Sequence, residues 1–127
     1  MNKLILFSRI LLGLMFTVFG LNGFLHFIRL LPHTGVADQF MGALYASKYL
    51  LVVCALEAVA GALLLVNRFG VLALAILAPI LVNIALFHAL MEPQRAWLAL
   101  TGVALWAVLA SRERLAFAAL WSPNGVS

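Results

Sequence analysis

Long apolar stretches separated by short polar breaks dominate the chain and predict helices that cross a membrane. Four such stretches stand out, and each is near the ~20 residues that span ~30 Å of hydrocarbon as a helix. They predict helices over about 4–27, 48–66, 69–90 and 93–111. The apolar cores of the second and fourth are short, and we expect snorkelling end residues to extend them.

The connections between these stretches differ in length and set the expected topology. Residues 28–47 form a long loop, whereas Asn67–Arg68 and Met91–Gln94 are tight links that force neighbouring helices antiparallel. We therefore predict an all-α fold, an integral membrane four-helix bundle of up-down-up-down topology, as a single domain over residues 1–127. The segment Arg112–Trp121 either lies in the interface or extends the fourth helix, and the tail 122–127 is expected to be disordered.

Composition supports the membrane assignment. Hydrophobic residues make up 66% and charged residues 9% of the 127 residues. A chain with so few polar residues cannot cover its apolar core with a polar surface in water. The net charge of +4 comes from basic residues that stand singly at segment ends, which is typical of topological anchors and not of a nucleic-acid face. Five of these lie on the side of the termini (Lys3, Arg9, Arg68, Arg112, Arg114) and three on the other (Arg29, Lys48, Arg95). This excess favours a multi-pass protein of the cell (plasma) membrane with cytoplasmic termini.

Five polar side chains are predicted to gather in the outer half of the membrane, toward the long loop. Glu57 is the only carboxylate within a membrane-length segment, where a charge costs a few kcal/mol. Asn22 and His26 lie in the last two turns of the first helix, and Asn83 and His88 lie at similar depth in the third. We expect these five residues to bind a ligand, with His26 and then Asn83 as partners of Glu57. Asn83 and His88 point about 140° apart, so His88 need not face the same cavity.

The opposite face of the first helix carries a stripe of small residues at helical spacing. Gly13, Thr17 and Gly20 follow Arg9 on this face, and small residues let helices approach closely. Only one face of the helix can point into the bundle, and we expect that to be the face with Asn22 and His26. The stripe is then expected to contact another subunit, lipid or the fourth helix. A homo-oligomer is the resulting prediction.

Other marked residues have structural interpretations. Gly61 shares a helix face with Cys54 and Glu57 and is expected to serve packing, and Pro79 frees the carbonyl of Ala75 and kinks its helix. The intramembrane Asn residues can act as interhelical hydrogen-bond donors, and the His residues as interface anchors. No local HxxxH or ExxH spacing is present, so we predict no metal site.

The ordered run of weak motifs resembles the DoxX-like family of small membrane proteins. The motifs are Arg9–Phe16, Phe19–Phe27, Met41–Tyr45, Leu56–Leu65, Asn67–Phe69 and Ala78–Asn83. The resemblance implies a four-helix bacterial membrane protein, in a family named after a subunit associated with quinone-linked oxidation of reduced sulfur compounds. Other members are linked to oxidative, thiol or quinone stress and to membrane redox enzymes as partners. It marks Asn22, His26, Glu57, Gly61, Pro79 and Asn83 as family-pattern positions without assigning them roles.

These observations lead to one main hypothesis and two alternatives. The main hypothesis is a redox-associated accessory subunit that binds a quinone-like apolar ligand at the polar cluster. The alternatives are a non-catalytic assembly or partner subunit of a larger membrane complex, and a small lipid-handling carrier. The sequence leaves open whether any reaction is catalysed, and quinone is the one cofactor it suggests.

Overall fold

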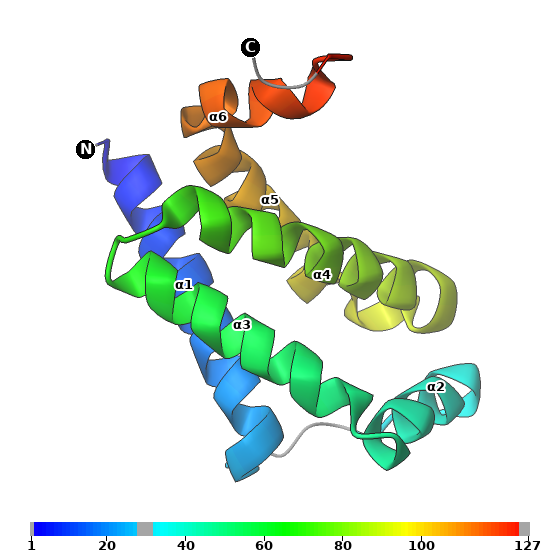
Figure 1. The fold of residues 1–127 in the computed structure, drawn as a ribbon. Helices are drawn as coiled ribbons and strands as arrows, with labels where there is room; N and C mark the ends of the chain where they lie inside the picture. The colour runs from blue at the N-terminus through cyan, green and yellow to red at the C-terminus, as the bar shows by residue number, and fades with distance from the viewer. Residues whose placement is uncertain (1, 28–31, 125–127) are drawn as a thin grey trace.

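The described part of the chain is built from helices alone. The computed structural model describes residues 2–27 and 32–124, and no strand occurs in these two ranges. Its helices are α1 (Lys3–Leu25), α2 (Gly35–Ala46), α3 (Tyr49–Leu65), α4 (Gly70–Met91), α5 (Ala96–Arg112) and α6 (Arg114–Ala118), with 3₁₀ turns at Pro93–Arg95 and Ala119–Trp121 (Figure 1). The predicted all-α class is confirmed for these residues.

Two helices are long and apolar enough to cross a membrane. They are α1, with 23 residues, and α4, with 22 residues. A third candidate span arises if α2 and α3, which meet at an 84° bend, are counted together. By themselves α3 and α5 have 17 residues each, or about 26 Å at ~1.5 Å per residue. The membrane-spanning four-helix bundle therefore stays a prediction.

The region predicted as a long loop contains a helix, α2. Asp38 lies in its first turn, where a carboxylate interacts favourably with the helix dipole, and Ala37 on the inner side is buried. Lys48 then takes a left-handed conformation with φ 64°, which turns the chain into α3. The loop prediction is wrong for residues 35–46, because the carboxylate in the first turn and the burial of Ala37 stabilise a helix within the connection. Its residues 28–31 and the tail residues 125–127 lie outside the described ranges.

The predicted ends of the long helices need small corrections. The first helix stops at Leu25, because His26 has φ 54° and closes the helix with a backbone hydrogen bond of 2.9 Å to the Asn22 carbonyl. At the other end of the chain, α5 reaches Arg112, and the backbone then breaks at Glu113 before the short α6. Of the two predicted outcomes for this segment, a continuous extension of the fourth predicted helix is therefore excluded.

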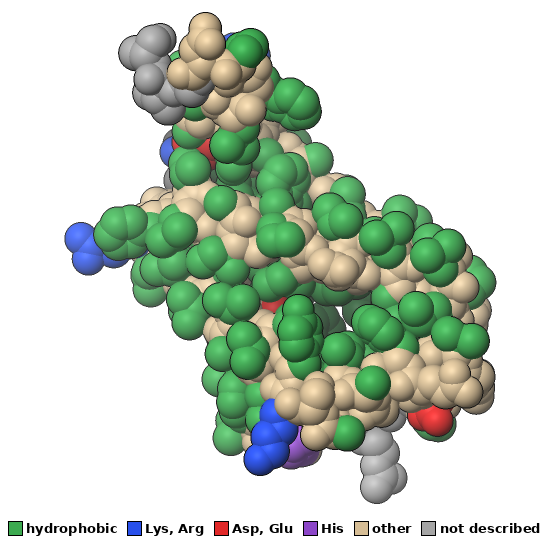
Figure 2. Space-filling model, turned by 45° about the vertical axis from the view of Figure 1, so that its right-hand side comes forward, with side chains coloured by type: hydrophobic (Ala, Val, Ile, Leu, Met, Phe, Trp, Pro, Cys, Tyr) green, Lys and Arg blue, Asp and Glu red, His purple; other side chains and the backbone are tan. Residues whose placement is uncertain are grey.

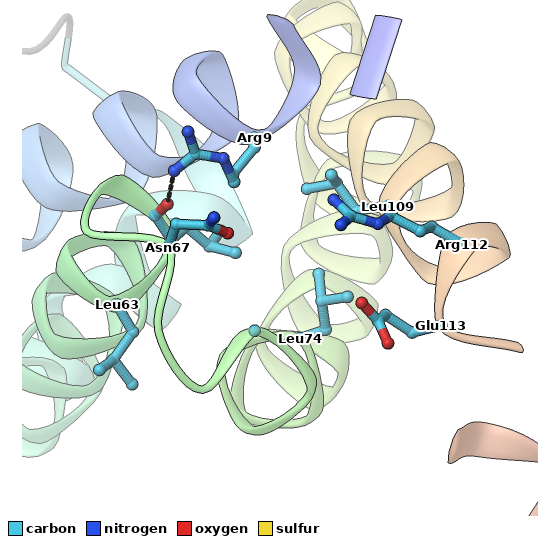
Figure 3. A pocket seen from close by; sticks show the side chains of 9 residues that line it. Arg9, Leu63, Asn67, Leu74, Leu109, Arg112 and Glu113 are labelled. Atoms are coloured by element: carbon cyan, nitrogen blue, oxygen red, sulfur yellow. Dashed lines mark hydrogen bonds between the residues drawn. The ribbon is translucent and has the colours of Figure 1, made fainter. Parts of the chain in front are cut away.

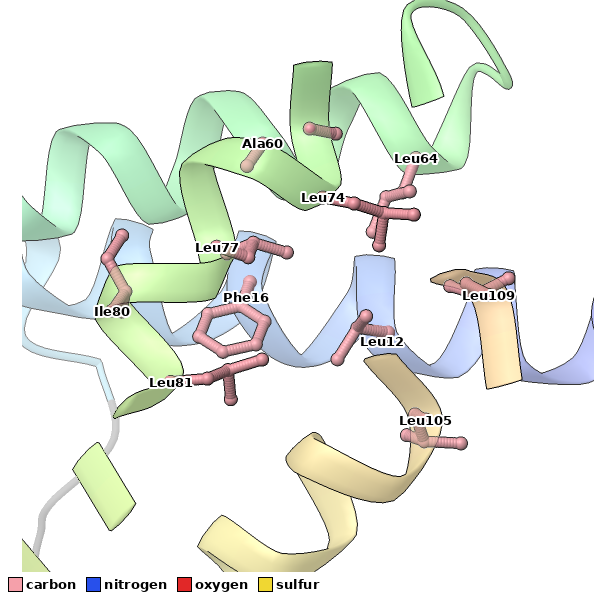
Figure 4. Close-up of a cluster of buried hydrophobic side chains, with 11 residues drawn as sticks. Leu12, Phe16, Ala60, Leu64, Leu74, Leu77, Ile80, Leu81, Leu105 and Leu109 are labelled. Carbon is pink, nitrogen blue, oxygen red and sulfur yellow. The ribbon is translucent and has the colours of Figure 1, made fainter. Parts of the chain in front are cut away.

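Four helices contact one another in a ring that encloses an apolar core. Helix α1 packs on α3 and α5, α4 packs on the same two helices, and α2 contacts α3 and α4. Figure 4 shows the core side chains that meet between them: Leu12, Phe16, Ala60, Leu64, Leu74, Leu77, Ile80, Leu81, Leu105 and Leu109. Many large hydrophobic side chains are exposed, and in the face that Figure 2 shows they are spread over the surface, while basic side chains lie at its edges.

Helices α1 and α3 approach each other along a seam of small residues. A Cβ on Gly20 would lie 2.6 Å from the backbone nitrogen of Ala58, and one on Gly61 would lie 2.5 Å from the backbone nitrogen of Thr17. Gly13 faces the carbonyl of Gly61 at 3.1 Å by the same measure. The partner predicted for this stripe is therefore wrong. The stripe contacts α3 of the same chain, because the two helices need glycine on both sides to come this close.

Candidate ligand site

Glu57 lies on the inner side of α3 and is only 9% exposed. It is one turn from Ala60 and two turns from Leu64, which both belong to the core, so helical periodicity directs it toward the interior of the ring. No hydrogen bond or ion pair joins it to another residue within the described ranges. A buried carboxyl group without a partner among the described residues costs free energy, which makes this position the strongest candidate for a ligand contact.

Asn22 is the predicted cluster member that the fold brings to the depth of Glu57. It is buried, at 7% exposed, on α1. Its neighbours Gly20 and Gly23 face Ala58 and Cys54, which flank Glu57 along α3. The antiparallel register of the seam therefore puts Asn22 and Glu57 at the same level.

His26 lies farther toward the α2–α3 bend and is exposed. It lines a cavity of about 210 Å³ between the end of α1 and the bend, together with Tyr45 and Lys48. Leu51 lines the same cavity and is six residues before Glu57, which corresponds to about 9 Å along the helix. His26 and Glu57 share no hydrogen bond or ion pair among the described contacts, so the expected pair is not formed.

Asn83 and His88 are not brought to Glu57. Asn83 is exposed, and its Nδ2 donates a 2.8 Å hydrogen bond to the carbonyl of Pro79 in its own helix. His88 is half-buried at the end of α4, where its ring meets Phe87 edge-on and Nδ1 lies 3.4 Å from the carbonyl oxygen of Glu92. Pro79 is accommodated within α4, which continues unbroken from Gly70 to Met91.

A second buried carboxylate, Glu92, was not among the predicted site residues. It is 2% exposed in the α4–α5 connection, and it pairs with His33 before α2 and with Arg95 Nη1 at 3.0 Å. Arg95 also donates a 3.0 Å hydrogen bond to the carbonyl of Pro32. This cluster joins the start of the α2 region to the α4–α5 turn. The signal in the sequence was an acidic residue three positions before an arginine; nothing in it indicated His33 as the distant partner.

Arg9 is tied to the opposite end of the α1–α3 seam. Its Nη1 donates hydrogen bonds of 2.5 Å and 3.2 Å to the carbonyl oxygens of Leu64 and Leu65 in the last turn of α3. The Leu64 carbonyl also accepts a 3.2 Å hydrogen bond from the backbone N–H of Asn67, and a cation is favourable at this end of a helix. Figure 3 shows Arg9 beside a small cavity of about 30 Å³, with Asn67 and Arg112 among the residues that line it. The hydrogen bonds of Arg9 therefore link α1 to the end of α3.

Metal-site geometry does not occur within the described ranges, since no three His, Cys, Asp or Glu side chains gather there as ligands would. Comparison with known proteins gives no match, either to a protein-family model, to a curated protein or to a solved structure.

Proposed function

We propose that the chain is a multi-pass protein of the plasma membrane, a four-helix up-down-up-down bundle with cytoplasmic termini. The apolar surface and the two span-length helices support insertion. The segments that share the small cavity beside Arg9 support the alternation, because the start of α1, the α3–α4 turn and the end of α5 meet there. The excess of basic residues at this end supports its cytoplasmic orientation.

We further propose that the protein is a redox-associated accessory subunit of the DoxX-like type, which binds a quinone-like apolar ligand at Glu57. The observation that carries this proposal is the burial of Glu57 on an apolar helix without a hydrogen-bond partner among the described residues. A carboxyl group fits such a ligand in both redox states. The protonated carboxyl group donates a hydrogen bond to a quinone carbonyl oxygen, and the deprotonated carboxylate accepts one from a quinol hydroxyl group.

The proposed site contains fewer residues than the site expected from the sequence. Asn22 joins Glu57 at the same depth, while His26, Asn83 and His88 serve elsewhere in the fold. The ligand supplies redox chemistry when bound, and the chain supplies a hydrogen bond in an apolar environment. An apolar ligand of this kind enters laterally from the lipid, between helices whose outer faces are hydrophobic.

Titration of menaquinone or ubiquinone into the purified protein in nanodiscs tests this proposal. We expect saturable quenching of tryptophan fluorescence, with affinity at least tenfold weaker for Glu57→Leu, because leucine removes every hydrogen-bonding group of the side chain at similar volume. Glu113→Leu, at the end of α5, is the matched control and should leave affinity unchanged. The absence of saturable binding in both detergent and nanodiscs would overturn the proposal.

A non-catalytic assembly role is less well supported. The small-residue stripe at Gly13, Thr17 and Gly20, which was the expected docking face, packs against α3. Docking to a membrane redox enzyme or a second copy would therefore need another face of the chain. The lipid-handling alternative is addressed by the same nanodisc titration, with phospholipid as the competing ligand.

A further inference from the structure

The cavity at the α2–α3 bend has a composition that differs from the rest of the surface. It has a volume of about 210 Å³ and lies where the end of α1 meets the end of α2 and the start of α3. Its lining residues are Gly23, His26, Leu44, Tyr45, Lys48, Leu50 and Leu51. A dry cavity of about 150 Å³ already holds benzene, so this one accommodates a chemical group of similar size.

Three of the lining side chains bring hydrogen-bond donors to the cavity. Lys48 carries an ammonium group, Tyr45 a hydroxyl group and His26 a ring N–H. None of the three makes a side-chain hydrogen bond or ion pair within the described ranges, and no carboxylate lines the cavity there. A site with an ammonium group, two further donors and no carboxylate among its described lining residues selects an anionic group.

The remaining lining residues are apolar and continue onto lipid-accessible surface. Leu44, Leu50 and Leu51 form the apolar side of the cavity. Beyond it, Leu25 on α1 and Val52 on α3 are 65% and 62% exposed, which provides a hydrophobic path away from the donors. Figure 2 shows a basic side chain against a histidine side chain at the lower edge of the molecule, with hydrophobic side chains above them.

We propose that this cavity binds the phosphate of an anionic phospholipid, with an acyl chain lying along α1 and α3. The site is at the ends of two helices, where Tyr and Lys side chains meet the headgroup layer. Basic pockets between membrane helices bind anionic headgroups in this way. The left-handed conformations of His26 and Lys48 fix the ends of the two helices on which the donors lie. This inference rests on the proposed membrane insertion of the chain and is independent of a ligand at Glu57.

The test measures binding of phosphatidylglycerol, phosphatidylcholine and inorganic phosphate to the detergent-purified full chain by native mass spectrometry and thermal shift. We expect phosphatidylglycerol to bind saturably and to raise the melting temperature, and the other two to do neither. Lys48→Gln should weaken phosphatidylglycerol binding about tenfold or more, as the loss of a charged hydrogen bond does. Tyr45→Phe should weaken it less, because only a neutral donor is removed.

Lys3→Gln is the matched control, since Lys3 is an exposed lysine at the other end of α1. Equal weakening by Lys3→Gln and Lys48→Gln would show general surface attraction and overturn the proposal. Equal binding of phosphatidylcholine and phosphatidylglycerol would overturn it as well. Binding of inorganic phosphate as tight as that of the lipid would refute the assignment to a phospholipid. Glu57→Leu should leave phosphatidylglycerol binding unchanged, so failure of either proposal is distinguishable from failure of the other.

Discussion

Replacement of Gly61 by alanine tests whether the α1–α3 seam holds the fold together. The added Cβ would lie 2.5 Å from both the backbone nitrogen and Oγ1 of Thr17, and 2.8 Å from the carbonyl oxygen of Gly13. Ordinary contact begins at 3.4 Å, so the nearest atoms of α1 must move away from the added Cβ by about 0.9 Å. Two of these neighbours are backbone atoms, which cannot rotate away.

The cost of that separation follows from the packing it removes. A radial gap of about 0.5–1 Å forfeits a quarter to a half of the dispersion energy of the contacts it opens. Overpacking of a close interface costs about 1–3 kcal/mol, and we expect Gly61→Ala to fall in the upper half of that range. The hydrogen bonds from Arg9 to the end of α3 should lengthen as well, since they bridge the same two helices.

The assay is reversible unfolding in mixed detergent micelles, followed by circular dichroism, with Gly42→Ala as the control. A Cβ on Gly42 in α2 would have no neighbour within 4 Å, so alanine there should raise stability by about 0.5–1 kcal/mol. Gly102→Ala should be intermediate, because its closest neighbour at 3.1 Å is the flexible end of Leu81. A free energy of unfolding for Gly61→Ala within about 0.5 kcal/mol of the parent chain would refute the close-packed seam.

Three further substitutions test single interactions. Arg9→Leu removes the charged hydrogen bonds to the end of α3 and should lower the free energy of unfolding by about 2 kcal/mol; an unchanged value would mean that water replaces them. Phe69→Gly relieves a left-handed residue with φ 54° and should raise the free energy of unfolding by about 1 kcal/mol, whereas a loss would show that the exposed ring contributes more than the strain costs. Glu92→Gln weakens the ion pairs to His33 and Arg95 and should speed amide hydrogen exchange in α2 but not in α1. If the exchange rates in α2 are the same in the variant and the parent chain, these ion pairs do not hold α2 in place.

The long helices could be read from the sequence because their signal is local. Apolar runs bounded by Asn67–Phe69 and by Glu92–Pro93 place α4 within a residue or two of its observed ends. Helix α2 was missed because its 12 residues are too few to span a membrane and because it lies between two membrane-length stretches. The helix-forming signals were present, with Asp38 in the first turn and Ala37 on the inner side.

The membership of the site was harder to predict, because it depends on the direction in which each side chain points. Depth along a helix follows from ~1.5 Å per residue, and it placed both Asn22 and Glu57 in the outer half of the membrane, which agrees with the register of the seam. The depth of a residue does not predict that the Asn83 side chain hydrogen-bonds to the carbonyl of Pro79 in its own helix. Nor could it tell that His26, at a left-handed helix end, would line a cavity away from Glu57.

The sequence by itself determined the all-α class and the burial problem posed by Glu57, since both follow from local hydrophobicity and the cost of a carboxyl group in an apolar segment. Tertiary structure decided which surfaces meet. It directed the small-residue stripe on α1 to α3, paired Glu92 with His33 across 59 positions of the chain, and formed the cavity at Lys48. These contacts join residues distant in sequence, and helical periodicity fixes only the angle of a side chain about its own axis, not the neighbour that it faces.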